Sequence, residues 1–320
     1  MIISEQPSLE VIKSAAIRIQ SYIHRTPVMR SAFLDGLSKS ILFFKCENFQ
    51  KAGAFKSRGA MNAILSLTPD ELLRGVATHS SGNHAQALAR AAQIVGTKSY
   101  IVMPENAPKV KVAAVEHYNG KIFFCEPTLA ARESTLQKVV GQTGADLIHP
   151  YNDYRVIAGQ ATAGLELIEQ IPNLDLILCP VGGGGLLSGT ALTLRYLSPS
   201  TKLIGCEPLG ADDAQRSFKS NILCPSVNPK TIADGLLTSL GSLTFPIIMN
   251  YVSDIITVND DEIIQAMKYV WERMKIIIEP SAAVPLAVAL SGKIDLTGLK
   301  VGIIFSGGNV DVNNLPWKQQ

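Results

Sequence analysis

The stretch "DLILCPVGGGGLLSGTAL", Asp175 to Leu192, joins a short apolar run, four consecutive glycines and a helical pattern. An apolar run of this length that ends at a glycine turn is typical of a strand buried on both faces of a parallel sheet. Most other apolar runs in the chain are also followed by helical patterns; they begin at Ile41, Val76, Ser99, Lys121, Lys202, Asp254 and Val301. This alternation predicts an α/β fold with mainly parallel sheets that helices cover on both faces.

The composition is that of a compact globular chain. Of its 320 residues, 47% are apolar and 18% are charged, which is enough to bury a large interior. Lys and Arg together number 29 against 27 Asp and Glu, and no basic run occurs. This balance argues against nucleic acid or an anionic membrane as a partner, so we expect a small-molecule substrate.

The sequence favours a cytoplasmic protein. The first twenty residues lack the charged start and apolar core of a secretory signal. The most apolar segment, 280–290, is too short to span a bilayer. The five cysteines are far apart and form no C-x-x-C pair, which is typical of buried thiols in a reducing compartment.

Domain boundaries are not marked by a linker, a repeat or a low-complexity segment. A second domain would therefore be an insertion into the first. The strand-like runs from Val76 to Cys125 could form a small sheet of their own. We predict a small inserted α/β domain at 75–150 and a large domain made of 1–74 and 151–320.

The glycine run at 182–185 predicts a phosphate site. Because glycines carry no Cβ, successive backbone N–H groups can converge on an anion at the start of the helix that follows. The run is not a P-loop, since Thr190 stands where that motif requires Lys. The alternative is a flexible turn without a ligand.

Two further strands are followed by turns of small or polar residues. "SSGNHA", Ser80 to Ala85, precedes an alanine-rich helical pattern, and "IIFSGGNVD", Ile303 to Asp311, ends in a glycine turn. Each could also be an ordinary helix start or turn. Three such turns at strand carboxyl ends are where an open α/β sheet binds its ligand.

Lys56 lies in the stretch "KAGAFKSRGA", between Phe55 and Ser57. A lysine amine is nucleophilic only when deprotonated; apolar surroundings lower its pKa, and it can then form a Schiff base with an aldehyde. The alternative is a lysine that extends its charge to solvent. A reactive lysine together with a phosphate site is the minimum set for pyridoxal phosphate.

Five motifs in this order resemble the fold-type II pyridoxal phosphate enzymes of the serine racemase and serine/threonine dehydratase family. The motifs are "KAGAFKSRGA", "SSGNHAQAL", "VGGGGLLSG", "ERMKIIIEPSAA" and "SGGNVD". The likeness runs from Thr26 to Asp311. It implies a large domain with a mostly parallel, twisted sheet and a smaller α/β domain.

The resemblance also implies the cofactor-binding residues. Lys56 would hold pyridoxal phosphate covalently, Phe55 would pack by the ring, Asn83 would bond the ring hydroxyl, and Ser306 would face the pyridine nitrogen. Backbone N–H groups would bind the phosphate; they belong to Gly182, Gly183, Gly184, Gly185 and Leu186.

The implied chemistry uses two faces of the substrate Cα. Lys56 works on one face and Ser81 on the other, which permits racemisation. Loss of a β-hydroxyl instead gives a 2-oxo acid and ammonia. The substrate carboxylate would lie on the turn that contains Ser80, Ser81, Asn83 and His84. Arg132 matches an arginine that can contact a second carboxylate, and its alternative is an ordinary surface arginine.

A cation site is implied in "CEPLGADD", Cys206 to Asp213. In the family the same spacing binds Mg²⁺ or Ca²⁺ through Glu207, the carbonyl of Ala211 and Asp213, and Mn²⁺ has the same preference for oxygen ligands. The alternative is a solvated acidic turn.

Two other features of the family bear on regulation and assembly. Lys51 and Ser31 match the nucleotide site of serine racemases, but Ala32 and Ala52 stand where the mammalian enzymes carry hydroxyls, which argues against ATP activation. The resemblance implies a homodimer.

We therefore predict a pyridoxal phosphate enzyme with serine racemase and serine/threonine dehydratase activities at one site. The first alternative is a dehydratase of threo-3-hydroxyaspartate or a catabolic threonine dehydratase. The second is a non-catalytic module that binds pyridoxal phosphate or a nucleotide.

Overall fold

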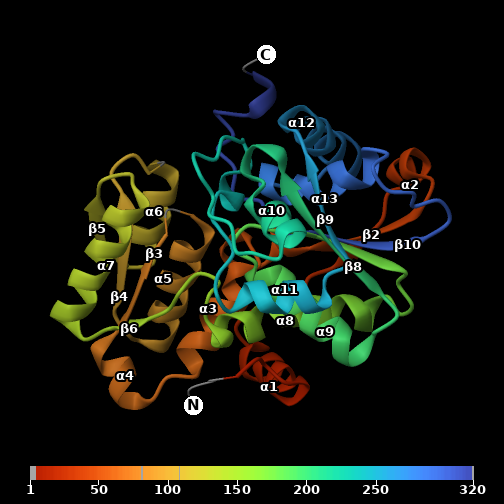
Figure 1. The fold of residues 1–320 in the computed structure, drawn as a ribbon. Coiled ribbons are helices and arrows are strands. Elements are labelled where there is room, and N and C mark those ends of the chain that lie inside the picture. The colour runs from red at the N-terminus through yellow and green to blue at the C-terminus, as the bar shows by residue number, and fades with distance from the viewer. Residues whose placement is uncertain (1–4, 81, 108, 319–320) are drawn as a thin grey trace.

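The computed structural model describes residues 5–80, 82–107 and 109–318. It contains two sheets in two lobes that lie side by side, with α3 (Lys56–Leu65) between them (Figure 1). The predicted α/β class is confirmed, and the eight predicted strands are present. Two strands of two residues each, β1 (Val28–Met29) and β6 (Asp146–Leu147), were not predicted.

The larger sheet has six strands in the order β1, β2, β10, β7, β8, β9. Their bounds are Ile41–Cys46 for β2, Lys300–Phe305 for β10, Leu176–Pro180 for β7, Lys202–Pro208 for β8 and Asp254–Val258 for β9. Only β1 pairs antiparallel, with β2, and the other pairs are parallel. The carboxyl ends of the five longer strands therefore lie at one edge of the sheet.

Helices cover both faces of this sheet. On one face, side chains such as Leu176 and Leu178 pack with α2 (Ala32–Ser38), α12 (Asp260–Tyr269) and α13 (Pro280–Leu290). On the other, Ile177 and Cys179 pack with helices of the first and middle parts of the chain. Those helices are α1 (Leu9–Ile19), α8 (Tyr154–Gln170), α9 (Gly185–Leu197), α10 (Asp213–Ser220) and α11 (Thr244–Tyr251).

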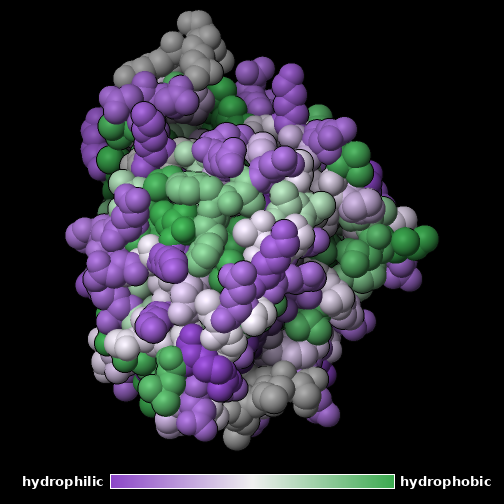
Figure 2. Space-filling view, turned by 90° about the vertical axis from the view of Figure 1, so that its left-hand side faces the viewer, coloured by the Kyte–Doolittle hydropathy of each residue, from purple (hydrophilic) through white to green (hydrophobic). Residues whose placement is uncertain are grey.

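The smaller sheet is entirely parallel, in the order β5, β4, β3, β6. The bounds of its longer strands are Lys121–Cys125 for β5, Ser99–Pro104 for β4 and Val76–His79 for β3. The helices of this lobe are α4 (Pro69–Arg74), α5 (Asn83–Val95), α6 (Lys109–His117) and α7 (Leu129–Thr143). Figure 2 shows this side of the molecule, where hydrophilic side chains surround a paler apolar area.

The predicted boundaries of the two domains stay a prediction. The separate sheet of β3 to β6 lies within 75–150, but the core beside it also includes side chains from outside that range. Ala60, Met61 and Ile64 of α3 pack in this core together with Leu88 of α5. The helix that begins with Lys56 thus packs on the smaller lobe as well as on α8.

The helix after β9 departs from regular geometry at its end. A capping box between Asn259 and Glu262 starts α12, and its apolar side chains Ile263 and Met267 are buried. From Val270 to Met274 the backbone is a π-helix. This widened turn precedes the segment that leads to Glu279 and α13.

A cluster of four buried charges fixes α3 against its neighbours. Arg58 bonds Glu47 Oε2 through Nε at 2.6 Å and Glu166 Oε1 through Nη1 at 2.7 Å, and Lys45 Nζ bonds Glu166 Oε2 at 2.6 Å. Two cations thus meet two carboxylates, which satisfies charges that burial would otherwise make costly. The cluster holds α3, and so Lys56 at its start, to α8 and to the end of β2.

Candidate active site

Three of the segments singled out in the sequence converge. The N–H of Phe55 donates to the carbonyl oxygen of Ser306 at 3.0 Å, and Ala54 forms an isolated bridge with Gly307. Asn309 Nδ2 donates to Asn83 Oδ1 at 2.9 Å. The lysine segment, the turn after β10 and the start of α5 therefore meet at one place.

Lys56 stands at the first position of α3 and is half-buried. Its Nζ donates to the carbonyl oxygen of Pro150 at 2.8 Å and lies 5.1 Å from the centre of the Phe55 ring. Desolvation lowers the pKa of the Lys56 amine to about 8, although the negative charge of Glu279 raises it. An amine with this pKa is partly deprotonated near neutral pH and can act as a nucleophile or a base.

The glycine run begins a helix at the carboxyl end of β7. Gly184 is the N-cap of α9, with a positive φ of 87°, and a glycine has no side chain with which to cap the helix. A Cβ on Gly183 would collide with the Tyr151 ring, and one on Gly185 would lie 3.0 Å from Tyr151 Cβ. The helix N-terminus thus has no side-chain cap and could receive an anion, and the predicted phosphate site stays a prediction.

The predicted ring-binding residues lie beside Lys56. Asn83 is the first residue of α5, and its Nδ2 donates to Glu279 Oε1 at 2.8 Å. Ser306 is buried, with 3% of its surface exposed, directly after β10. The hydrogen bond from Phe55 to the Ser306 carbonyl brings Ser306 next to the lysine segment.

The predicted substrate residues are only partly described. Ser81 lies outside the described residues. The Ser80 hydroxyl accepts from the N–H of Gly82 at 3.3 Å. The His84 ring is buried, with Nε2 at 3.2 Å from the carbonyl oxygen of Ile148, and burial lowers the pKa of His84 well below its usual value.

Arg132 lies on α7 of the smaller lobe. Its Nε donates to the carbonyl oxygen of Thr128 at 3.4 Å. Burial lowers the pKa of His79 to about 4, and the positive charge of Arg132 adds to this effect. The His79 ring meets the His149 ring edge to face at 5.7 Å. Arg132 therefore lies close enough to act electrostatically on the side of the site that His79 and His149 line.

Two residues of this site were missed in the sequence. Glu279 is 3% exposed, and burial raises the pKa of its carboxyl to about 8. Its signal was an acid in the apolar run "KIIIEPSAA". Tyr151 follows Pro150 and packs on Gly183, but nothing in its local sequence indicated this contact.

Comparison with known proteins identifies the family. The family model described as "Pyridoxal-phosphate dependent enzyme" matches residues 19–307. The chain belongs to this family. The resemblance noted in the sequence and the prediction of an enzyme are thereby confirmed, and a non-catalytic binding module is not supported.

Individual relatives are similar over nearly the whole chain. A beta-hydroxyaspartate dehydratase of Paracoccus denitrificans is 50% identical over 97% of this chain and 99% of its own. A serine racemase of Dictyostelium discoideum is 52% identical over 96% of both chains. The solved structure of maize serine racemase is 45% identical, has a TM-score of 0.95, and covers 98% of this chain and 97% of its own.

The residues present fit pyridoxal phosphate. The glycine N-cap of α9 leaves backbone N–H groups for a phosphate, and Tyr151 fills the space that side chains at 183 and 185 would need. An amine with a lowered pKa is available for the aldehyde. The family's cofactor would therefore find backbone N–H groups for its phosphate and an amine for its aldehyde in this site.

The predicted metal-binding acids are buried side by side at the end of β8. Glu207 and Asp213 are each 1% exposed. Glu207 Oε1 accepts from the N–H of Ala214 at 2.8 Å and Oε2 from that of Gln215 at 2.9 Å. Both side-chain oxygens of Asp213 lack a hydrogen-bond partner among residues 5–80, 82–107 and 109–318.

The electrostatics of this acidic pair fit a cation. Burial raises the pKa of Glu207 to about 9 and that of Asp213 to about 6, although backbone N–H groups lower the first and the charge of Arg216 lowers the second. Ala211, the predicted carbonyl ligand, is buried in the turn between the two acids. Within the described part of the chain, no group of three or more His, Cys, Asp or Glu side chains could hold a metal. The predicted site needs only two carboxylates and a carbonyl.

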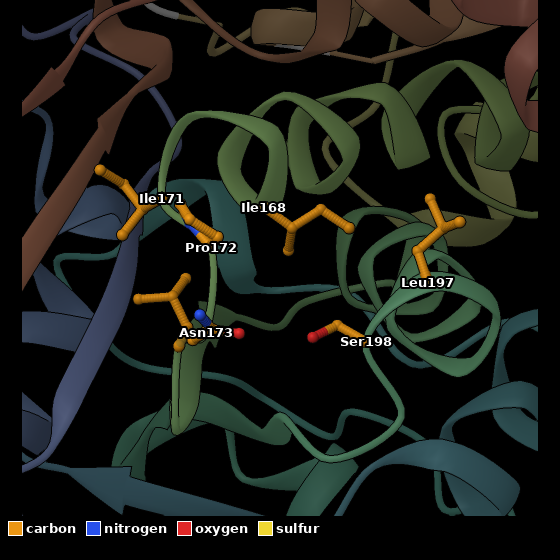
Figure 3. A pocket seen from close by; sticks show the side chains of 7 residues that line it. Ile168, Ile171, Pro172, Asn173, Leu197 and Ser198 are labelled. Carbon is orange, nitrogen blue, oxygen red and sulfur yellow. The ribbon is translucent and has the colours of Figure 1, made fainter.

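A separate cavity lies at the other end of β7. Figure 3 shows it between the last turns of α8 and α9, lined by Ile168, Ile171, Leu197 and Ser198 among others. Its volume is about 150 Å³. Its lining carries no charged side chain, and it lies at the amino end of the strand, away from the glycine run. It has no part in the candidate active site.

The lowered pKa of Lys56 predicts how the cofactor-free protein regains pyridoxal phosphate. Only the free amine attacks the aldehyde, so the rebinding rate should follow the deprotonation of Lys56. With a pKa of about 8, the rate rises roughly tenfold between pH 7 and pH 9 and then levels off. Stopped-flow absorbance of the bound cofactor measures this rate. A rate that keeps climbing beyond pH 10 would show an ordinary lysine instead.

Proposed function

We propose that this chain is a pyridoxal phosphate enzyme that racemises serine and also eliminates water from serine and threonine. The main support is the setting of Lys56: its amine of lowered pKa bonds the carbonyl of Pro150, which precedes the Tyr151 that packs on the glycine run, and its neighbour Phe55 bonds the Ser306 carbonyl. The likeness to serine racemases at about 50% identity gives the substrate class.

The chain's own residues hold the cofactor. Pyridoxal phosphate, when bound, withdraws electrons from the substrate Cα and so acidifies its C–H bond. The N–H groups of 182–186 would hold its phosphate, Phe55 would pack by the ring, and Asn83 would donate to the ring oxygen. Ser306 bonds the pyridine nitrogen through a neutral hydroxyl, which need not protonate it. A neutral hydroxyl at Ser306 would therefore favour reactions in which charge at Cα does not persist.

Lys56 moves the proton at Cα. With substrate bound, the free amine of Lys56 would lie beside the C–H bond and would accept the proton on one face. In this proposal Ser81, which lies outside the described residues, exchanges a proton on the opposite face of Cα. A proton returned from that face inverts the amino acid, whereas loss of the β-hydroxyl leads to a 2-oxo acid and ammonia.

The start of α5 binds the substrate carboxylate in this proposal. Backbone N–H groups at the helix N-terminus and the side chains of Ser80, Asn83 and His84 surround it. N-cap Gly82 has no side chain to occupy these N–H groups. Arg132 supplies a planar fork for a second carboxylate when the substrate carries one.

The second candidate function is dehydration of 3-hydroxyaspartate. It is favoured by the 50% identity to a beta-hydroxyaspartate dehydratase over 97% of this chain. This reaction uses the same proton transfer by Lys56, and in it Arg132 binds the β-carboxylate of the substrate. The two candidates differ in the substrate and in whether a proton returns to Cα.

Product analysis separates these functions. We predict that L-serine gives both D-serine and pyruvate, and that Lys56→Ala loses both products together with the absorbance of the bound cofactor. Chiral chromatography and a 2-oxo acid assay with L-serine, L-threonine and L-threo-3-hydroxyaspartate provide the measurement. Absence of D-serine, with rapid turnover of hydroxyaspartate, would exclude the racemase and leave the dehydratase.

We also propose that Glu207, the carbonyl of Ala211 and Asp213 bind Mg²⁺, Ca²⁺ or Mn²⁺. Two buried carboxylates, one of them without hydrogen-bond partners in the described ranges, need a compensating charge. A hard cation with water ligands supplies it. The cation stabilises the folded state and takes no direct part in the chemistry at Cα.

Mg²⁺ should therefore raise the melting temperature of the protein. A ligand that binds only the folded state stabilises that state by mass action. A chelator that removes Mg²⁺ should therefore lower the melting temperature again. The Glu207→Gln/Asp213→Asn double variant should melt at a temperature that Mg²⁺ no longer changes. Asp212→Asn is the matched control, because Asp212 is exposed and pairs with Arg216. An equal loss of the response in Asp212→Asn would place the cation elsewhere.

The remaining assignments rest on the family resemblance. We propose a homodimer in the cytoplasm. Within the described residues, no helix has the length and apolar character needed to cross a bilayer. We do not extend the proposal to ATP activation, because Ala32 and Ala52 lack the hydroxyls of the mammalian enzymes.

A further inference from the structure

Glu279 is a buried acid in direct contact with the segment that follows β10. It is the N-cap of α13, and its N–H donates to the carbonyl oxygen of Gly307 at 3.0 Å. A Cβ on Gly307 would lie 2.6 Å from Glu279 Oε1. The carboxyl group therefore packs against the backbone next to Ser306, inside the site and beside the predicted ring-binding residues.

The orientation of the Asn309 amide follows from a backbone carbonyl. Asn309 Nδ2 donates to the carbonyl oxygen of Ala52 at 2.8 Å. A carbonyl oxygen can only accept, so the nitrogen of this amide must be the atom that faces it. Gly53, with a φ of 68°, lets the chain approach closely, because a Cβ there would collide with the Asn309 side chain.

The orientation of the Asn83 amide then follows from Asn309. The same Nδ2 of Asn309 donates to Asn83 Oδ1 at 2.9 Å, so the Asn83 oxygen faces Asn309. The Asn83 nitrogen faces the other way and donates to Glu279 Oε1 at 2.8 Å. A reversed Asn83 amide would set its N–H groups against the N–H of Asn309 and would lose that bond, so the Asn309 side disfavours the reversal.

One N–H of Asn83 remains for a ligand. An amide nitrogen carries two N–H groups, and Glu279 takes one of them. The amide oxygen is already occupied by the donor from Asn309. In the proposed function Asn83 donates to the ring oxygen of pyridoxal phosphate, and that bond requires an N–H, not an oxygen, toward the ring.

We propose that Glu279 and Asn309 are positioning residues that hold the Asn83 amide in the orientation that donates an N–H to the cofactor's ring oxygen. This inference rests on the proposed function. Neither residue touches the substrate in it. Their effect reaches the cofactor through Asn83, which stabilises the ionised ring oxygen over the protonated one.

The test compares variants of the full-length protein loaded with pyridoxal phosphate. The first readout is the dissociation constant of the cofactor. The second is the ratio of two absorbance bands: the longer-wavelength band comes from the ring with an ionised oxygen, and the shorter-wavelength band from the ring with a protonated oxygen. Asn83→Ala removes the donor; we expect about tenfold weaker binding, as for loss of a hydrogen bond to a charged group, and a shift toward the shorter-wavelength band.

Glu279→Ala and Asn309→Ala should each reproduce the shift of Asn83→Ala. Glu279→Gln should keep the longer-wavelength band, because a glutamine oxygen can still accept from Asn83. The Asn83→Ala/Glu279→Ala double variant should be no weaker in cofactor binding than Asn83→Ala alone, because both changes act through the same bond. If Glu279→Ala does not fold, Asn309→Ala and its double variant with Asn83→Ala give the same comparison.

The outcomes separate this inference from the function beneath it. A normal spectrum in Glu279→Ala and Asn309→Ala, with a shifted one in Asn83→Ala, would overturn the positioning role alone. Full additivity of Glu279→Ala with Asn83→Ala would also overturn it. If Asn83→Ala itself binds the cofactor normally, or the unaltered protein binds none, the assignment of Asn83 or the proposed function fails instead.

Discussion

The N–H of Phe55 donates to the carbonyl oxygen of Ser306, and this bond joins two parts of the chain that are far apart in sequence. The donor of this bond is the residue before Lys56, and the acceptor is the residue directly after β10, so the bond fixes both. Parallel strands place their carboxyl ends at one edge, so the turn after β7 opens on the same side of the sheet. Lys56, the glycine run and Ser306 owe their common location to this arrangement.

Desolvation then gives the site its chemistry. The buried cations and acids near α3 neutralise one another, as in the pairing of Arg58 with Glu47 and Glu166. Lys56 has a backbone carbonyl as its hydrogen-bond partner, so burial lowers the pKa of its amine. Glu279 has amide partners, and burial raises the pKa of its carboxyl. Ionisable groups of one region thus differ in pKa because of the groups that face them.

The sequence was sufficient for the features that depend on local pattern. Continuous apolar runs predicted the eight longer strands, and the glycine run predicted a helix start with open N–H groups. Two-residue strands such as β1 and β6 are too short to leave a periodic pattern. The roles of Glu279 and Tyr151 depend on partners far away in sequence: Asn83 lies 196 positions before Glu279. No local rule could have paired them, and only the folded chain brings them together.

The central claim is that Lys56 is the residue that carries pyridoxal phosphate, and chemical trapping tests it most directly. The protein loaded with the cofactor is reduced with borohydride, digested and mapped by mass spectrometry. The account predicts a single phosphopyridoxyl group on the Nζ of Lys56, within the peptide that contains Phe55 and Ser57. A label on another lysine, or no label in a protein that binds the cofactor, would contradict it.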